Sequence, residues 1–189
     1  MDIEKQFIDW LKDAYFMESN YAKALEEHLQ PAKEYPRLHR LIEEHLWATT
    51  GHAYEVGLCL ERANQNIKDL SGARSALQFP FEQPASDRPD TVINNIIVEL
   101  ATEHYEIARY IELITAATNV GDLATVQACE AILEDEEAMA EKLIVELPEI
   151  TSTYLELLFL SERRKLVTSN GSEFGRTRAL TRFAPKAAA

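Results

Sequence analysis

Residues 90–118 read DTVINNIIVELATEHYEIARYIELITAAT. Apolar residues recur in this stretch every three or four positions, which is the spacing of one face of an α-helix. The apolar stripe comprises Ile93, Ile96, Ile97, Leu100, Ile107, Tyr110, Ile111 and Ile114, and Glu103 interrupts it. Asp90 can cap the start of the helix, and Asn119 with Gly121 can end it. The pattern therefore predicts a helix over about residues 90–118.

The same periodicity fills most of the remaining chain, and the alternation typical of β-strands is nearly absent. It predicts helices over about residues 3–30, 36–68 and 122–147, and a shorter fifth helix over residues 149–165. Pro31 and Pro36 separate the first two patterns, and Pro148 follows the fourth. We therefore expect an all-α protein.

The connections between these helices predict their arrangement. A few residues join the first helix to the second and the third to the fourth, so each pair should form an antiparallel hairpin. A long stretch, about residues 69–89, joins the second helix to the third and lets both start at the same end. Two hairpins with one long crossover are the ferritin-like arrangement. The expected organisation is a ferritin-like four-helix bundle with a fifth C-terminal helix over residues 1–165, then a basic tail over residues 166–189.

The charge of the chain is unevenly distributed. The net charge is −13, which argues against nucleic acid as a partner of the body of the protein. Residues 161–189 contain seven basic and two acidic side chains, so this end carries +5 and the rest of the chain −18. The basic end can dock on the acidic body, on a partner subunit or on a polyanion, or remain solvated.

Several features favour a cytoplasmic protein with no membrane contact. No apolar run approaches the roughly 20 residues that a helix needs to cross a bilayer. The N-terminus begins an amphipathic pattern and lacks the basic and apolar regions of a signal peptide. Cys59 and Cys129 lie among apolar residues at helical spacing, which indicates reduced core thiols in a reducing compartment.

Polar residues on the apolar stripes point to a metal site. They are Glu18, His45, His52, Glu103 and Glu136. A carboxylate in a protein core is costly unless it is paired or bound to a cation. Three of the helices each carry a Glu near mid-length, and the fourth carries histidine. This arrangement matches the ligands of a carboxylate-bridged metal pair. Iron or manganese suits such ligands.

The expected site departs from the usual di-iron pattern. Glu-x-x-His, which two helices of such bundles carry, is replaced by Thr49-x-x-His52, Glu103-x-x-Glu106 and Glu136-x-x-Met139. The predicted ligands are therefore Glu18, His52, Glu103, Glu106 and Glu136. The alternative is that some of the 32 acidic residues merely fall at a stripe edge and reach water. His28 and His39 lie off the stripes and are expected at the surface.

Residues 103–110, EHYEIARY, resemble the EHYEIA-x-Y segment of the YciE/YciF-type ferritin-like proteins, a bacterial family of unknown function linked to stress responses. The similarity extends over about residues 3–147. It implies a ferritin-like bundle, often dimeric, whose carboxylates at positions 18, 103, 106 and 136 can hold metal. This chain has Ala48 where the family tends to have Glu, His52 where it tends to have Gln, and Met139-Ala140 where it tends to have Thr-Asp.

The sequence is compatible with two functions. The first is a metal-binding protein that handles peroxide or sequesters iron under stress. The second is a metal-free, dimeric structural or interaction protein whose basic tail holds a partner. The sequence has no glycine-rich phosphate loop, Ser/His/Asp constellation or Cys-x-x-Cys motif, so it supports no specific enzymatic reaction.

Overall fold

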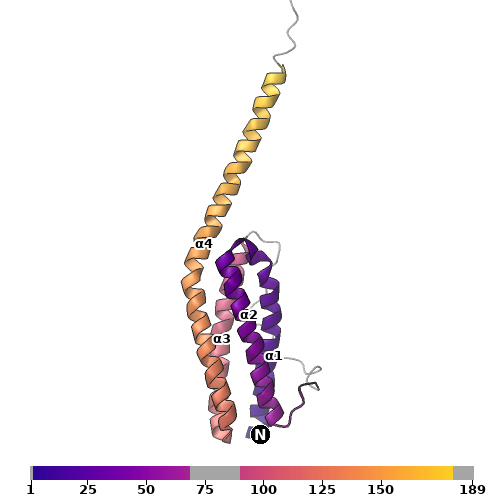
Figure 1. Ribbon diagram of the computed structural model, residues 1–189, viewed down its shortest axis with the longest axis vertical. Helices are drawn as coiled ribbons and strands as arrows, with labels where there is room; N and C mark the ends of the chain where they lie inside the picture. Colours follow the sequence, from indigo (N-terminus) through magenta and orange to yellow (C-terminus); the bar gives the residue numbers. More distant parts are fainter. Residues whose placement is uncertain (1, 69–89, 181–189) are drawn as a thin grey trace, which may run out of the picture. The chain divides into compact units, whose positions relative to one another are not determined.

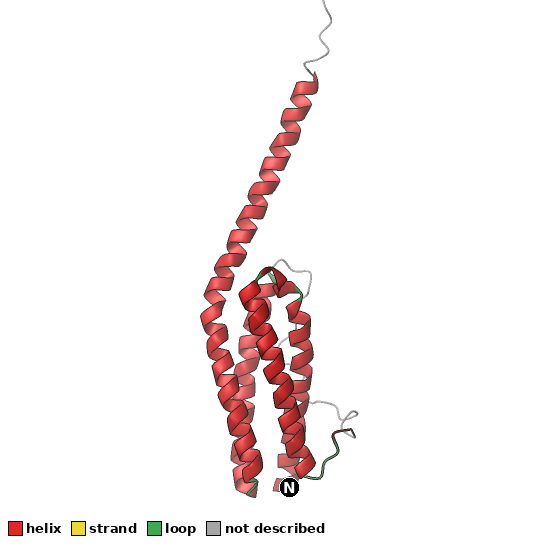
Figure 2. Ribbon diagram, viewed as in Figure 1, coloured by secondary structure: helices red, strands yellow, loops and turns green. Residues whose placement is uncertain are grey.

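The computed structural model describes residues 2–68 and 90–180, with side chains as far as Lys165. It contains helix α1 (Ile3–Leu29), the short 3-10 helix η1 (Pro31–Glu34), and helices α2 (Pro36–Arg62), α3 (Thr91–Val120) and α4 (Leu123–Leu180) (Figure 1). No strand occurs among these residues, which confirms the all-helical prediction (Figure 2). The predicted crossover and the last nine residues of the tail lie outside the described residues.

The chain divides into two compact units, Met1–Ile150 and Thr151–Ala189. The first unit contains the helical bundle. Within the described helices, none combines the length and apolar character needed to cross a lipid bilayer.

The ends of α1 and α3 follow from local sequence. The side chain of Asp2 accepts a hydrogen bond from the backbone N–H of Glu4 and so caps α1. Gly121 ends α3 in the left-handed conformation, with φ of 78°, which costs glycine little because it has no Cβ atom.

Helix α2 is shorter than predicted. It ends at Arg62 and not near Lys68. The backbone N–H of Ala63 bonds to the carbonyl of Cys59, and Asn64 takes a positive φ of 57°. Asparagine tolerates this conformation better than most residues, so it can terminate a helix much as glycine does.

Helix α4 does not stop at Pro148, as we expected. Residues 149–165 are helical, as predicted, but they continue α4 instead of forming a separate fifth helix. Proline lacks a backbone N–H and therefore removes one hydrogen bond to the preceding turn. The residues on both sides of Pro148 still remain helical, because the loss is confined to that turn.

Two apolar clusters form the core. The first joins the first half of α1 to the second halves of α2 and α3 and to the start of α4, and it includes the free, buried thiols of Cys59 and Cys129. The second joins the second half of α1 to the first halves of α2 and α3 and to a later part of α4. Helices α2 and α3 therefore run parallel, while α1–α2 and α3–α4 are antiparallel hairpins (Figure 1), in agreement with the predicted connections.

Helix α3 is rotated relative to the predicted apolar stripe. Its buried face includes Asn95, Glu99, Thr102, Glu103 and Glu106. Ile97 and Ile111 from the predicted stripe are instead 50% and 51% exposed. The hydrophobic effect alone would favour burial of the isoleucines over the carboxylates. The polar inner face of α3 therefore needs a specific explanation, and the neighbouring helices supply it.

Candidate metal centre

The five predicted ligands meet inside the bundle, between the two apolar clusters. Helix α1 contributes Glu18, α2 contributes His52, α3 contributes Glu103 and Glu106, and α4 contributes Glu136. None of the five is more than 6% exposed. The alternative in which these side chains reach water at the edge of a stripe is therefore wrong for all of them.

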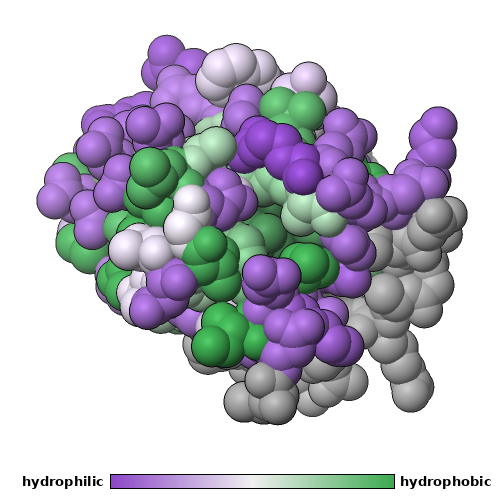
Figure 3. Space-filling view, turned by 90° about the horizontal axis from the view of Figure 1, so that it is seen from below, coloured by the Kyte–Doolittle hydropathy of each residue, from purple (hydrophilic) through white to green (hydrophobic). Residues whose placement is uncertain are grey.

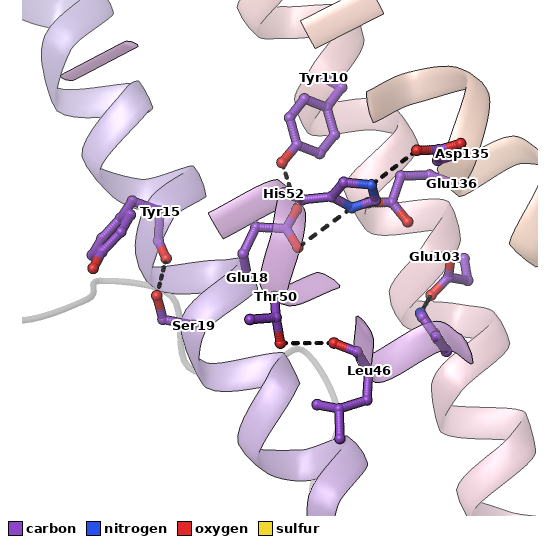
Figure 4. A network of polar contacts seen from close by, with 11 residues as sticks. Tyr15, Glu18, Ser19, Leu46, Thr50, His52, Glu103, Tyr110, Asp135 and Glu136 are labelled. Atoms are coloured by element: carbon purple, nitrogen blue, oxygen red, sulfur yellow. Dashed lines mark hydrogen bonds and ion pairs between the residues drawn. The ribbon is translucent and has the colours of Figure 1, made fainter. Parts of the chain in front are cut away.

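One group of potential ligands comprises Glu18, His52 and Glu136. One nitrogen or oxygen atom from each lies within 4.8 Å of those from the other two. His52 Nδ1 is 2.8 Å from Glu136 Oε1 and 3.9 Å from Glu18 Oε2. The side chains converge from three helices (Figure 4), so a cation at this point would have one nitrogen and two oxygen ligands.

A second group comprises His45, Glu103 and Glu136, again within 4.8 Å of one another. His45 Nε2 lies 2.8 Å from Glu103 Oε1. His45 was expected on the buried stripe of α2 but was not among the predicted ligands. Glu136 belongs to both groups.

Glu106 lies among these carboxylates without being part of either group. Both of its carboxylate oxygens are buried without a hydrogen-bond partner in the described structure. Burial and the charges of Glu18 and Glu136 hold the pKa of Glu106 well above its usual range. Buried carboxylate oxygens that accept no hydrogen bond are costly in the absence of a bound cation.

Two further side chains hold the first group in place. The Tyr110 hydroxyl donates a 2.5 Å hydrogen bond to Glu18 Oε1. His52 Nε2 donates a 3.3 Å hydrogen bond to Asp135 Oδ2, so the other ring nitrogen, Nδ1, faces the carboxylates (Figure 4). Tyr110 was predicted to be a core-packing residue; it is fully buried, and it also contacts the site.

The second group has its own supporting pair, which the sequence analysis missed. His28 Nδ1 is 2.6 Å from Glu99 Oε1, and Glu99 Oε2 is 4.0 Å from His45 Nδ1. The prediction that His28 lies at the surface is wrong, because it is 3% exposed. His28 follows Tyr21 by seven residues on the inner face of α1, so helical spacing could have identified it.

The charges of the interior do not balance on their own. Among the residues whose side chains the structure describes, five carboxylates are buried, at positions 18, 99, 103, 106 and 136, against three buried histidines, at positions 28, 45 and 52. Even with every histidine protonated, two negative charges would remain in a dry space. Protons or bound cations must compensate for them.

The pKa values show how protons would share this role. Burial raises the pKa of Glu103 to about 7, although the neighbouring His45 opposes the shift. Burial alone would lower the pKa of His52, but Glu136 and Glu18 outweigh it and raise that pKa to about 9. Around neutral pH, a divalent cation would therefore compete with protons for the Glu103 carboxyl group and the His52 ring.

The set of ligand atoms is chemically consistent with iron or manganese. Carboxylate oxygens and imidazole nitrogens suit both metals, and the set contains no thiolate. Met139, one turn after Glu136, is buried in the second apolar cluster. The buried cluster therefore offers carboxylate oxygens together with ring nitrogens of His45 and His52, and it could hold a metal ion.

Comparisons with known proteins agree with this architecture. Residues 2–156 match the family described as a domain of unknown function, DUF892. A solved structure of a protein from Xanthomonas campestris pv. campestris is 31% identical, with a TM-score of 0.68, and the match covers 82% of this chain and 97% of that one.

Two further solved structures share the fold. The Escherichia coli stress protein YciF is 24% identical, with a TM-score of 0.65 and coverage of 80% of this chain and 98% of YciF. YcfI from Rhodopseudomonas palustris is 23% identical, with a TM-score of 0.60 and coverage of 76% and 93% respectively.

Proposed function

The chain belongs to the DUF892 family, and on this basis we propose that it is a ferritin-like metal-binding protein whose bundle holds a pair of iron or manganese ions. The observation that carries this proposal is the position of Glu136, which belongs to two ligand groups at once. One ion would be bound by Glu18, His52 and Glu136, and the other by His45, Glu103 and Glu136.

The remaining buried groups support this assignment. Glu106 adds a buried carboxylate whose two oxygens have no hydrogen-bond donor in the described structure. Tyr110 holds Glu18, and Asp135 holds His52 in the orientation that turns Nδ1 toward the site. Bound iron or manganese would supply redox chemistry toward an oxidant such as peroxide, or a means of holding iron in a protected form.

We place this activity in the cytoplasm under stress. The named relative YciF is described as a stress protein, and the two buried cysteines are free. We further propose a homodimer, because α3 presents Ile97 and Ile111 on its outer face instead of toward the core. The basic C-terminal end is then left to contact a partner, for which the acidic body of a second subunit offers complementary charge.

The test is metal analysis of protein purified without added chelator, beside a Glu136→Gln variant. We expect one to two iron or manganese ions per wild-type chain and a marked loss in the variant, because the substitution removes a ligand common to both groups. Glu137→Gln is the matched control, since Glu137 is an exposed neighbour on the same helix. Absence of metal from the wild type, with no binding of added Fe²⁺ or Mn²⁺, would contradict the proposal.

A second candidate function rests on the pairing of histidines with carboxylates. His45 lies against Glu103, and His52 lies against Glu136, so protonated histidines could stabilise a metal-free bundle. The protein would then be a structural or interaction protein with a partner-binding tail. Its mark would be an unchanged melting temperature in chelator and on addition of Fe²⁺ or Mn²⁺.

A further inference from the structure

The two ligand groups share Glu136 but differ in the residues that contact the outer ring nitrogen of each histidine. His45 presents Nε2 to the carboxylates, whereas His52 presents Nδ1. The second ring nitrogen of each histidine faces a different carboxylate. These two outer carboxylates, Glu99 and Asp135, occupy opposite environments.

Glu99 is an enclosed support. Its side chain is fully buried, and the 2.6 Å contact with His28 fixes Oε1. Oε2 faces His45 Nδ1 at 4.0 Å and has no hydrogen bond from another group in the described structure. At this distance the attraction is electrostatic, and burial strengthens it because little water screens the charge. A negative charge behind a histidine makes the imidazole a better metal ligand.

Asp135 is an open support. Its side chain is 68% exposed, so water screens its charge on His52. It also lines a surface hollow of about 500 Å³ between α2 and α4, together with Trp47 and Met139. The hydrogen bond that orients His52 can therefore exchange with water, while the contacts behind His45 cannot.

From this asymmetry, and on the premise of the proposed two-metal function, we propose that Glu99 and His28 are positioning residues that make the His45–Glu103–Glu136 site the tighter of the two. That site fills first and keeps its ion. The Glu18–His52–Glu136 site fills second and exchanges its ion with solvent past Asp135. The protein therefore alternates between one and two bound ions as the free metal concentration changes.

The experiment is a calorimetric titration of the metal-free, full-length protein with Mn²⁺ at fixed pH. Wild type should show two Mn²⁺-binding events, one tighter and one weaker. Glu99→Gln keeps the shape of the side chain but removes its charge, and it should weaken the tighter event by about 10–100-fold. Asp135→Asn should weaken only the second event, and by less. Glu134→Gln, an exposed neighbour of Asp135, should change neither.

A second variant covers the case in which Glu99→Gln does not fold. His28→Asn frees Glu99 Oε1 and should weaken the same event in a smaller degree, and circular dichroism would confirm that the bundle is intact. If Glu99→Gln folds and leaves the tighter event unchanged, or if it and Asp135→Asn weaken the same event, the ordered filling is wrong while the two-metal function stands. If wild type binds no Mn²⁺, the proposed function itself fails.

Discussion

Glu103 Oε1 lies 2.8 Å from His45 Nε2 across the interface of α2 and α3, and both side chains are buried. The same carboxyl group has a pKa raised to about 7, chiefly by burial. Burial therefore favours the protonated form of this glutamate in the metal-free protein. The stability of the metal-free bundle should therefore depend on pH in an unusual direction.

We predict that the metal-free protein becomes less stable as pH rises from 4.5 to 9. The folded-state pKa of Glu103, about 7, lies above its ordinary value of 4.5, so the folded state binds more protons in that interval and stability falls as pH rises through it. His52, with a pKa raised from 6.5 to about 9, acts in the same direction over the higher interval. Denaturant midpoints measured in chelator at several pH values would show the trend.

The Glu103→Gln variant supplies the control for this trend. It should flatten the fall in stability between pH 4.5 and 7, and the effect of Glu103 over that interval is on the order of 3 kcal/mol. A metal-free wild type that gains stability over the same interval would contradict the assignment of a raised pKa to this buried carboxyl.

A second prediction concerns Glu106, whose two oxygens are buried without hydrogen-bond partners in the described structure. Glu106→Gln should stabilise the metal-free protein at pH 8 by about 1–3 kcal/mol. At this pH a buried carboxyl group must either stay ionised or take up a proton, and both cost free energy, whereas a neutral amide needs neither. The same variant should gain less stability than wild type on addition of Mn²⁺. Thermal melts with and without metal would measure both effects, and Glu137→Gln should alter neither.

A third prediction concerns the hydrogen bond between Tyr110 and Glu18. Tyr110→Phe removes the donor and leaves Glu18 Oε1 buried without it, which should destabilise the metal-free protein by about 1–3 kcal/mol. It should also weaken Mn²⁺ binding at the site assigned to Glu18 and His52, while the Mn²⁺ affinity of the site assigned to His45 changes by less than twofold. Loss of both events to the same degree would argue against two distinct sites.

A fourth prediction concerns the outer face of α3. Ile97 and Ile111 are half exposed, and Ile111 borders an apolar groove of 570 Å³ that Ile3 and Trp10 also line. Seen from the end where α1 begins, Figure 3 shows apolar residues at the surface among polar ones. If a second copy covers this face, Ile97→Glu with Ile111→Glu should convert a dimer into a monomer in light-scattering measurements.

The control for the dimer is Ile144→Glu, since Ile144 is equally exposed but lies on α4. This variant should remain dimeric. A monomeric wild type at micromolar concentration, or a dimer that survives both substitutions on α3, would contradict the assigned interface.

Most of the bundle could be predicted because helix periodicity, prolines and connection lengths are local signals. The exceptions were also local: Asn64 ended α2 early, and Pro148 did not interrupt α4. The rotation of α3 could not be found from hydrophobicity, because Ile97 and Ile111 at one edge of its apolar stripe are exposed while Glu99 and Glu106 are buried. It depends on what the other three helices place opposite it.

The candidate site was predicted only in part, because helical spacing identifies single residues but not the contacts between helices. Glu103 and Glu106 were identified from their spacing, but Glu99, one turn before Glu103, was not, although it lies on the same face. His28 was assigned to the surface because it lies off the predicted apolar stripe of the first helix, whereas the structure buries it. The pairing of His28 with Glu99 spans 71 residues, and only the fold brings those two side chains together.

The central claim is that Glu136 joins two metal ions, and electron paramagnetic resonance of the Mn²⁺-loaded protein tests it most directly. At two ions per chain, wild type should show the signal of a magnetically coupled pair, and Glu136→Gln should lose that coupling. If the loaded wild type shows only isolated Mn²⁺ ions, or only the signal of Mn²⁺ free in solution, the shared-carboxylate site is contradicted.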